Sequence, residues 1–222
     1  MIILENVNKI YNENRANSFH ALKDISLHVK EGELVILKGV SGSGKSTLLS
    51  IIGSLIKPSS GSVIVDGDSI AKLPDLHASH FRAKKLGFIF QSFNLFEALS
   101  VADNVATPLI NQPLTPKQLS LHVKKAMSIA QIDHKADSDV RLLSGGEKQR
   151  CAIARALVND AKIILCDEPT ANLDADNSQK FIQTLLELNR LGKTVVVATH
   201  DTLFETLECR VIDIKNGELV RK

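Results

Sequence analysis

One glycine-rich segment constrains this chain more than any other feature. The residues Gly39-Val-Ser-Gly-Ser-Gly-Lys-Ser46 fit the pattern G-x-x-x-x-G-K-[ST]. An apolar, strand-like run, Leu34–Leu37, precedes them. Apolar residues at helical spacing follow them: Leu48, Ile51, Ile52 and Leu55. This order of strand, loop and helix is the context that a P-loop requires, whereas a plain Gly/Ser-rich turn, the alternative interpretation, does not account for the flanks.

The loop has the chemistry to hold a nucleotide. Gly42 and Gly44 leave backbone amides open to an anion, and the following helix N-terminus favours phosphate. We expect Lys45 to reach the β- and γ-phosphates and the Ser46 hydroxyl to ligate Mg²⁺. The predicted nucleotide-contacting residues of this loop are Gly39, Val40, Ser41, Gly42, Ser43, Gly44, Lys45, Ser46 and Thr47.

A second glycine-rich motif, Leu143-Ser-Gly-Gly-Glu147, lies about a hundred residues later. Its S-x-x-E pattern is typical of a capping box at the start of a helix. A capping box does not need two glycines, each of which costs about 1 kcal/mol relative to alanine in a helix. We interpret Ser144, Gly145, Gly146 and Glu147 as a second anion site. Because one γ-phosphate already has its loop, this site is expected to serve the nucleotide of another copy.

Two acids end the apolar run Ile163-Ile-Leu-Cys-Asp167-Glu168. Ligands of α/β sheets bind at the carboxyl ends of strands, so we expect Asp167 to orient Mg²⁺ and Glu168 to polarise the attacking water as general base. A solvated Asp-Glu turn is the alternative. His200 follows the apolar strand-like run Thr194–Ala198, where it could reach a γ-phosphate, although a histidine at a strand end is more often structural.

Two other residues are ambiguous in isolation. Gln91 ends the strand-like Gly87–Phe90. Tyr11, the only tyrosine, is placed in a loop after the first strand, where it could stack on an adenine or be a half-buried surface aromatic.

Composition narrows the function classes. The 222 residues carry a net charge of +2, with 27 basic and 25 acidic side chains and no basic stripe, so nucleic acid is not an expected partner. The three cysteines, Cys151, Cys166 and Cys209, lack C-x-x-C spacing and are interpreted as reduced core residues, which suits the cytoplasm. No run of about 18 apolar residues occurs, so we do not expect the chain itself to enter a membrane.

The order of elements predicts an α/β core interrupted by a helical subdomain. Strands are expected at Ile2–Val7, Ile25–Val29, Leu34–Leu37, Ser62–Val65, Gly87–Phe90, Ile163–Cys166, Thr194–Ala198 and Arg210–Ile214, with a hairpin to Leu219-Val220. Helices are expected at Lys45–Ile56, Asp75–Lys84, Val101–Ile110, Pro116–Gln131, Gly145–Val158, Asp174–Leu191 and Thr202–Leu207.

Taken together, these residues resemble the nucleotide-binding subunits of ABC transporters over nearly the whole chain. The matching motifs, in family order, are the adenine-stacking aromatic Tyr11, the Walker A loop Gly39–Ser46, the Q-loop Gln91, the signature motif Leu143–Glu147, Walker B Ile163–Glu168, the D-loop Ala171–Asp174 and the switch histidine His200. The resemblance implies ATP hydrolysis with Mg²⁺ held by Ser46, Gln91 and Asp167, and catalysis by Glu168, His200 and Gln91.

The resemblance also implies an architecture and partners. The fold would be a P-loop NTPase (RecA-like) core, residues 1–91 and 159–222, with an N-terminal antiparallel β subdomain and an inserted α-helical signature subdomain, 92–158. Two copies would dimerise head to tail, with each ATP between one P-loop and the other copy's signature motif. A coupling helix of a separate permease would dock near Phe93, Leu95 and Phe96, at the cytoplasmic face of the inner membrane.

Within the family, the insertion-like Asn12–Phe19, the segment Gln91–Phe96 and the D-loop Ala171-Asn172 look most like the lipoprotein-release, macrolide-export and cell-division group. Many transporters have Ser-Ala where this D-loop has Ala-Asn, and Cys166 occupies an apolar Walker B position. Two alternatives stay open: a mechanical signal transmitter that moves no substrate, and a soluble non-transport ABC ATPase.

Three weaker signals are set aside. Asn8-Lys9-Ile10 begins like a guanine-reading motif, but Tyr11 stands where that motif has aspartate, so GTP specificity is not supported. His77 and His80 have helical i,i+3 spacing; a solvated polar face is favoured over a metal site because no further Cys or His is near in sequence. Phe88 and Phe90, which alternate with Ile89, are expected in the core.

Overall fold

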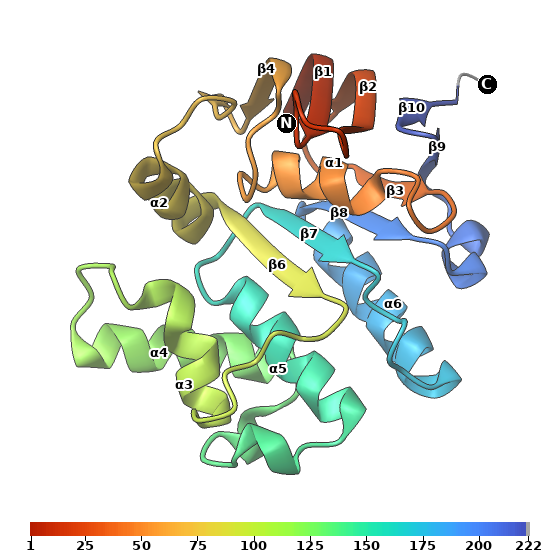
Figure 1. Ribbon diagram of the computed structural model, residues 1–222. Coiled ribbons are helices and arrows are strands. Elements are labelled where there is room, and N and C mark those ends of the chain that lie inside the picture. Colours follow the sequence, from red (N-terminus) through yellow and green to blue (C-terminus); the bar gives the residue numbers. More distant parts are fainter. Residues whose placement is uncertain (221–222) are drawn as a thin grey trace.

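The computed structural model describes residues 1–220. Within them, the strands form a six-stranded sheet in the order β10-β9-β3-β8-β7-β6 and a four-stranded sheet in the order β2-β1-β4-β5 (Figure 1). The predicted α/β fold, with its antiparallel β region, P-loop core and helical insertion, is confirmed.

Parallel pairing dominates the six-stranded sheet. β3 (Leu34–Lys38) lies between β8 (Thr194–Thr199) and β9 (Arg210–Lys215), and β7 (Ile163–Asp167) joins β8 to β6 (Leu86–Phe90). The short β10 (Glu218–Leu219) pairs antiparallel with β9. β8 is buried along its whole length, because helices and the second sheet cover both faces. Parallel pairing brings the carboxyl ends of β3, β7 and β8 to one edge.

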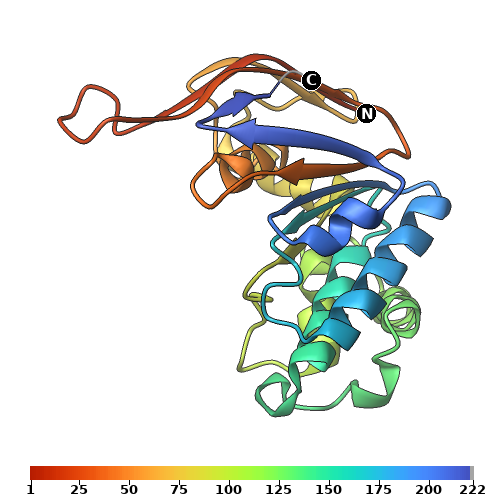
Figure 2. The same cartoon turned by 90° about the vertical axis from the view of Figure 1, so that its right-hand side faces the viewer.

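The four-stranded sheet is built on a long hairpin. β1 (Ile2–Tyr11) pairs antiparallel with β2 (Phe19–Val29) and with β4 (Ser60–Val65), which pairs with β5 (Asp68–Ser69). The tip of the β1–β2 hairpin extends away from the body (Figure 2). Tyr11 is the last residue of β1, opposite Phe19, so its placement in a loop was wrong: cross-strand pairing continues past the apolar pattern that ends at Val7.

The helices form two groups. α1 (Lys45–Ile52) packs against β7 and β8, and α2 (Asp75–Lys85) packs against β6. α6 (Ala175–Arg190) packs against β8. α3 (Val101–Ala106), α4 (Pro116–Ile129) and α5 (Gly145–Leu157) pack against one another, and α5 also lies on β6. Four 3₁₀ segments are described: η1 (Thr107–Leu109), η2 (Asp133–Lys135), η3 (Val140–Leu142) and η4 (Thr202–Thr206).

Several predicted boundaries were wrong for local reasons. α1 was expected to reach Ile56, but it ends before Gly53, and Ser54 then takes a positive φ of 52°. The helix expected to reach Ile110 changes to 3₁₀ at Thr107, next to Pro108, whose ring disfavours a continued α-helix. The segment expected as a helix at Thr202–Leu207 is also 3₁₀.

Alternate residues of the six-stranded sheet pack into two separate hydrophobic clusters, one on each face. On β8, Val195 and Val197 face the cluster that contains the helices α3 to α6, whereas Val196 and Ala198 face α1 and the four-stranded sheet. Phe88 and Phe90 were expected in the core. Both are half-buried on the edge strand β6, where Phe88 packs against the second cluster, and Ile89 between them is fully buried. Their rings stack with centroids 5.5 Å apart.

Within residues 1–220, no helix combines the length and the apolar character needed to cross a membrane.

Candidate functional site

A cavity of about 390 Å³ opens at the carboxyl edge of the six-stranded sheet. It brings together residues from five separate segments. They are Phe19, Ala21, Ser41, Gly42, Ser43, Gly44, Lys45, Ser46, Thr47, Gln91, Glu168 and His200. Gln91, Glu168 and His200 therefore meet the P-loop, as the sequence predicted. Phe19 and Ala21 were not anticipated, and Gly39, Val40, Asp167 and Tyr11 do not line the cavity.

Glycine is needed at positions 42 and 44 of the loop for different structural reasons. Gly42 has φ +78° and Gly44 has φ +110°, a region that other residues rarely adopt. A Cβ at Gly42 would meet nothing within 4 Å, so the approach to the loop is open there. A Cβ at Gly44 would lie 2.9 Å from the carbonyl oxygen of Ala21, so this glycine also allows β2 to pack on the loop. The buried Ser43 hydroxyl lacks a partner among the described residues, which suits a loop that receives a phosphate.

Lys45 is held at the centre of the loop. Its Nζ donates to the carbonyl oxygens of Gly39, at 2.7 Å, and Val40, at 3.2 Å, and lies 3.4 Å from Glu168 Oε1. The side chain is only 5% exposed. An anion that enters the loop therefore competes with Glu168 for a buried ammonium group.

Two oxygen donors face each other beside the loop. The Ser46 hydroxyl donates to Asp167 Oδ1 at 2.8 Å. Burial raises the pKa of Asp167 above its ordinary value, and the neighbouring Glu168 charge adds to the effect. Hydroxyl and carboxylate oxygens of this kind are ligands that Mg²⁺ prefers, so these residues fit the ion that the fold implies. Gln91 is exposed at the cavity, and its carbonyl oxygen accepts a hydrogen bond from Asn172 at 2.9 Å.

Glu168 is oriented by groups at the end of β8. Its Oε2 accepts from the Thr199 hydroxyl at 3.1 Å and the His200 amide at 3.3 Å, and its Oε1 lies 3.0 Å from His200 Nδ1. Burial favours the neutral acid, but the hydrogen bonds from His200 and Thr199 outweigh it and lower the pKa of Glu168 below its ordinary value. The carboxylate is therefore ionised at neutral pH, beside a histidine side chain that is 67% exposed.

Sequence reasoning missed two supporting residues. Thr199 binds the Glu168 carboxylate, and Asn172 ties the segment after β7 to Gln91. Thr199 could have been found from its position in the sequence, because it is a polar residue at the end of an apolar strand and is followed by a histidine. Asn172 lies within a recognised motif, but no sequence pattern indicates that its partner is Gln91.

The second glycine-rich motif begins α5 with the predicted capping box. Ser144 Oγ accepts from the Glu147 amide, and Glu147 Oε2 accepts from the Ser144 amide at 2.8 Å. The backbone hydrogen bond from Ser144, together with Lys135 at 3.2 Å, lowers the pKa of Glu147 to about 2. None of residues 144–147 lines the P-loop cavity, so within one chain the two glycine-rich motifs stay apart.

The two glycines of this motif serve different purposes. A Cβ at Gly146 would lie 2.5 Å from Asn177 Oδ1, whereas a Cβ at Gly145 would meet only the Asn172 carbonyl oxygen, at 3.6 Å. Close packing of α5 on α6 thus favours glycine at position 146, because any larger residue there would make the Asn177 side chain shift. The explanation of both glycines by phosphate approach stays a prediction, with packing on α6 as an additional reason for glycine at position 146.

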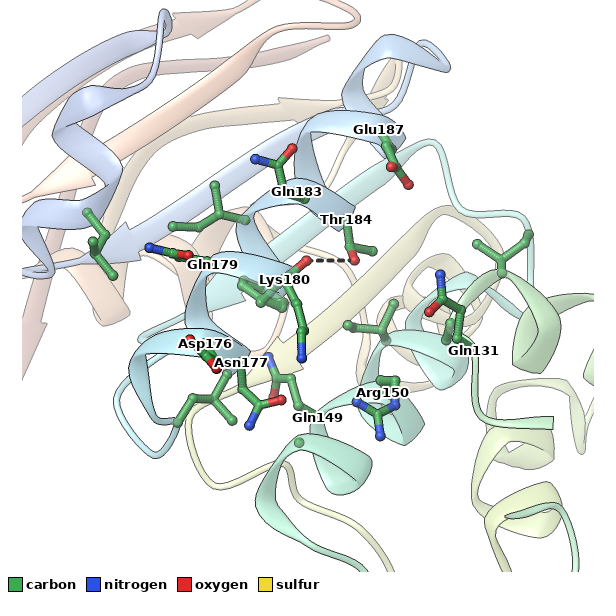
Figure 3. A pocket seen from close by; sticks show the side chains of 18 of the residues that line it. Gln131, Gln149, Arg150, Asp176, Asn177, Gln179, Lys180, Gln183, Thr184 and Glu187 are labelled. Atoms are coloured by element: carbon green, nitrogen blue, oxygen red, sulfur yellow. Dashed lines mark hydrogen bonds between the residues drawn. The ribbon is translucent and has the colours of Figure 1, made fainter. Parts of the chain in front are cut away.

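A larger cavity, about 750 Å³, lies between α5 and α6 (Figure 3). Apart from Gly146, it is lined by residues outside the predicted site, among them Gln149, Arg150 and Lys180. Gln149 Nε2 donates to the Pro169 carbonyl oxygen at 3.1 Å, so the helix that begins at the second motif contacts the segment that follows Glu168.

The remaining candidate residues do not line the P-loop cavity. His77 and His80 are exposed on α2, and residues 1–220 contain no group of three or more His, Cys, Asp or Glu side chains that could hold a metal. Cys151 and Cys166 are buried and Cys209 is half-buried, as free thiols. Burial raises the pKa of the Cys151 thiol to about 11, so it is not a reactive thiolate.

Comparisons with known proteins agree with this geometry. The family model described as "ABC transporter" matches residues 22–171. An uncharacterised ABC transporter ATP-binding protein of Methanocaldococcus jannaschii, MJ0796, is 42% identical over 100% of this chain and 96% of its own. The macrolide export ATP-binding/permease protein MacB of Campylobacter jejuni is 41% identical over 99% of this chain. That alignment spans only 34% of MacB, so this chain has about a third of that relative's length.

Solved structures share the fold. The dimeric structure of MJ0796 in a post-hydrolysis state bound to ADP and Pi is 41% identical, covers 100% of this chain and 97% of its own, and superposes with a TM-score of 0.91. CbiO1 of Clostridium perfringens, part of the transporter complex cbiONQ, is 33% identical, covers 99% of this chain and 86% of its own, and gives a TM-score of 0.85.

Proposed function

The chain belongs to the ABC transporter family and is an ATP-binding cassette ATPase, and we propose that it powers a separate membrane permease as a head-to-tail dimer. The observation that carries the proposal is the convergence of Lys45, Glu168 and His200 on the cavity of one glycine-rich loop.

In the proposed reaction, water attacks the γ-phosphorus of ATP and the bond to the β-phosphate oxygen breaks. Glu168, ionised and oriented by Thr199, accepts the proton from water, and Lys45 neutralises charge on the phosphates. His200, whose Nδ1 lies 3.0 Å from Glu168 Oε1, would hold the water and the γ-phosphate. Ser46, Asp167 and Gln91 would hold Mg²⁺, which when bound would supply positive charge against the phosphate oxygens.

The signature motif would complete the site of the partner copy. Its separation from the P-loop cavity and the open space at Gly145 support this arrangement. The N-terminus of α5 would then direct its amides and dipole at the partner's γ-phosphate. The relative MJ0796 has been solved as a dimer with ADP and Pi. We propose residues 92–158 as the helical subdomain that carries this motif, because α3, α4 and α5 pack on one another.

The permease would dock beside Gln91. A cavity of about 340 Å³ there is lined by Phe88, Phe90 and Phe96, among others. Phe96 is 57% exposed, which supports a contact surface, whereas Phe93 and Leu95 are half-buried beside it. A short coupling helix could lay its apolar face here. By analogy with MacB, whose name describes macrolide export, the proposed transport is of the export type. The resemblance of the motifs to the lipoprotein-release group keeps lipoprotein extraction as the other proposal, and in both the chain would act at the cytoplasmic face of the inner membrane.

Two measurements test this function. Isolating the chain from membranes and identifying the bound integral-membrane subunit is expected to yield a permease; recovery without any such subunit would contradict the coupling. In the same preparations, Lys45→Ala should abolish ATP binding and hydrolysis, and hydrolysis at the wild-type rate would contradict the assignment of the P-loop.

A further inference from the structure

The start of β2 lies against the phosphate loop. The carbonyl oxygen of Ala21 is 2.9 Å from the position that a Cβ on Gly44 would occupy, and Lys23 donates its amide to Gly217 at 2.8 Å. The extra residue at Ala21 forms a bulge in the pairing of β1 with β2. Ala21 and Phe19 both line the cavity of the P-loop, so the strand continues outward from the loop along the cavity wall.

Phe19 presents a large apolar ring to solvent beside the phosphate loop. It is 58% exposed, and residues 1–220 provide no ring or cation contact for it. Two residues of extended chain span about 7 Å. Phe19 therefore lies about 7 Å from Ala21, where β2 contacts the loop, and this distance is roughly the length of a sugar. A large apolar ring at this distance from a triphosphate cradle lies where a nucleoside would be.

Tyr11 stands directly opposite Phe19 in the hairpin. Residues opposite each other in an antiparallel pair project from the same face of the sheet. One face of the Tyr11 ring is covered by the Lys9 ammonium, 5.1 Å from the ring centroid, which also donates to the Lys57 carbonyl oxygen at 2.8 Å. Tyr11 therefore has one ring face left, and it does not itself line the cavity.

We propose that Phe19 is a second aromatic contact for the nucleoside, so that Phe19 and Tyr11 together form the wall on which the base rests. This proposal rests on the proposed ATP binding and extends it to a residue outside the recognised motifs. Stacking on an aromatic ring accepts any base, because every base has a π-face. Phe19 should therefore add affinity for nucleotides in general and not select adenine over guanine.

The test compares ligands with and without a nucleoside. For the 222-residue chain, Phe19→Ala should weaken ADP and GDP binding each by about tenfold, while the affinity for inorganic pyrophosphate stays unchanged. Phe19→Trp should bind ADP like the wild type. The matched control is His20→Ala: His20 contacts Asn8 at 3.1 Å and does not line the cavity, so its loss should leave ADP affinity unchanged.

The outcomes separate this proposal from the proposed function. Unchanged ADP affinity in Phe19→Ala, or equal losses for ADP and pyrophosphate, would overturn the role of Phe19. If the wild-type chain bound neither ligand, or if Lys45→Ala bound both normally, the P-loop assignment itself would fail, and the role of Phe19 with it.

Discussion

Replacing Glu168 by glutamine should stop turnover without loss of ATP binding. Glutamine keeps the shape of the side chain, and its amide oxygen can still accept from Thr199 and the His200 amide, which now lie 3.1 and 3.3 Å from Oε2. It cannot accept the proton of the attacking water. Loss of a positioned general base costs a factor of about 10²–10⁴ in rate, or about 3–5 kcal/mol in the barrier.

The same change should not weaken ATP binding, because Glu168 competes with phosphate for Lys45. Two unit charges 3.4 Å apart attract each other by about 5 kcal/mol in an effective dielectric of about 20, before desolvation costs are subtracted. Removing that charge frees the buried ammonium for the nucleotide and removes a like charge near the γ-phosphate. ATP affinity in Glu168→Gln should therefore equal or exceed that of the wild type, and the unliganded protein should be less stable.

The assay combines single-turnover phosphate release, ATP binding and size-exclusion chromatography with ATP and Mg²⁺. Glu168→Gln is expected to run as a dimer that retains ATP. Glu218→Gln, an exposed carboxylate on β10, is the matched control and should behave like the wild type. Hydrolysis by Glu168→Gln within tenfold of the wild-type rate, together with a persistent monomer, would refute the reasoning.

Three further predictions concern the signature motif and the docking surface. Gly146→Ala should destabilise the monomer by about 1 kcal/mol in a thermal melt, because its Cβ would make the Asn177 side chain shift. Gly145→Ala should leave stability unchanged or raise it by up to about 1 kcal/mol, and equal melting temperatures for the two would contradict the packing argument. Glu147→Gln should lower the free energy of unfolding by about 1 kcal/mol at pH 7. Folding lowers the pKa of Glu147 from 4.5 to about 2, so the stabilisation by its carboxylate is complete above pH 4.5 and is lost as the pH falls towards 2. The difference between variant and wild type in denaturation curves should disappear over the same range. Phe96→Ser should weaken recovery of the permease in pull-downs while basal hydrolysis and the melting temperature stay close to wild type; a large fall in melting temperature would show that this side chain belongs to the core.

Much of the site can be predicted from the sequence because its motifs depend on residues that lie close together in the chain. The P-loop needs its glycines and Lys45 at fixed spacing, and the capping box of α5 needs only Ser144 and Glu147 three residues apart. Parallel pairing then places Glu168 and His200 together, since β7 and β8 are neighbours and end at the same edge.

The features that could not be predicted depend on contacts between segments that are far apart in the sequence. The preference for glycine at position 146 arises from Asn177 on α6, and the length of β1 depends on pairing between Tyr11 and Phe19. Phe88 has the alternating pattern of a core residue, yet its exposure is decided by how little covers the edge strand β6. In each case the neighbours come from distant parts of the sequence, so no local sequence pattern predicts the feature.

Complementation between two inactive variants tests the composite site most directly. Lys45→Ala damages the P-loop, and Ser144→Arg places bulk and charge at the N-terminus of α5, where the partner's γ-phosphate would bind. In a mixed head-to-tail dimer both defects fall on the same site and the other site is intact. A one-to-one mixture of the two purified variants should therefore hydrolyse ATP at up to about a quarter of the wild-type rate, because half of the dimers are mixed and each has one intact site. If each chain instead used its own signature motif, no intact site would form, and a mixture no faster than either variant alone would contradict the account.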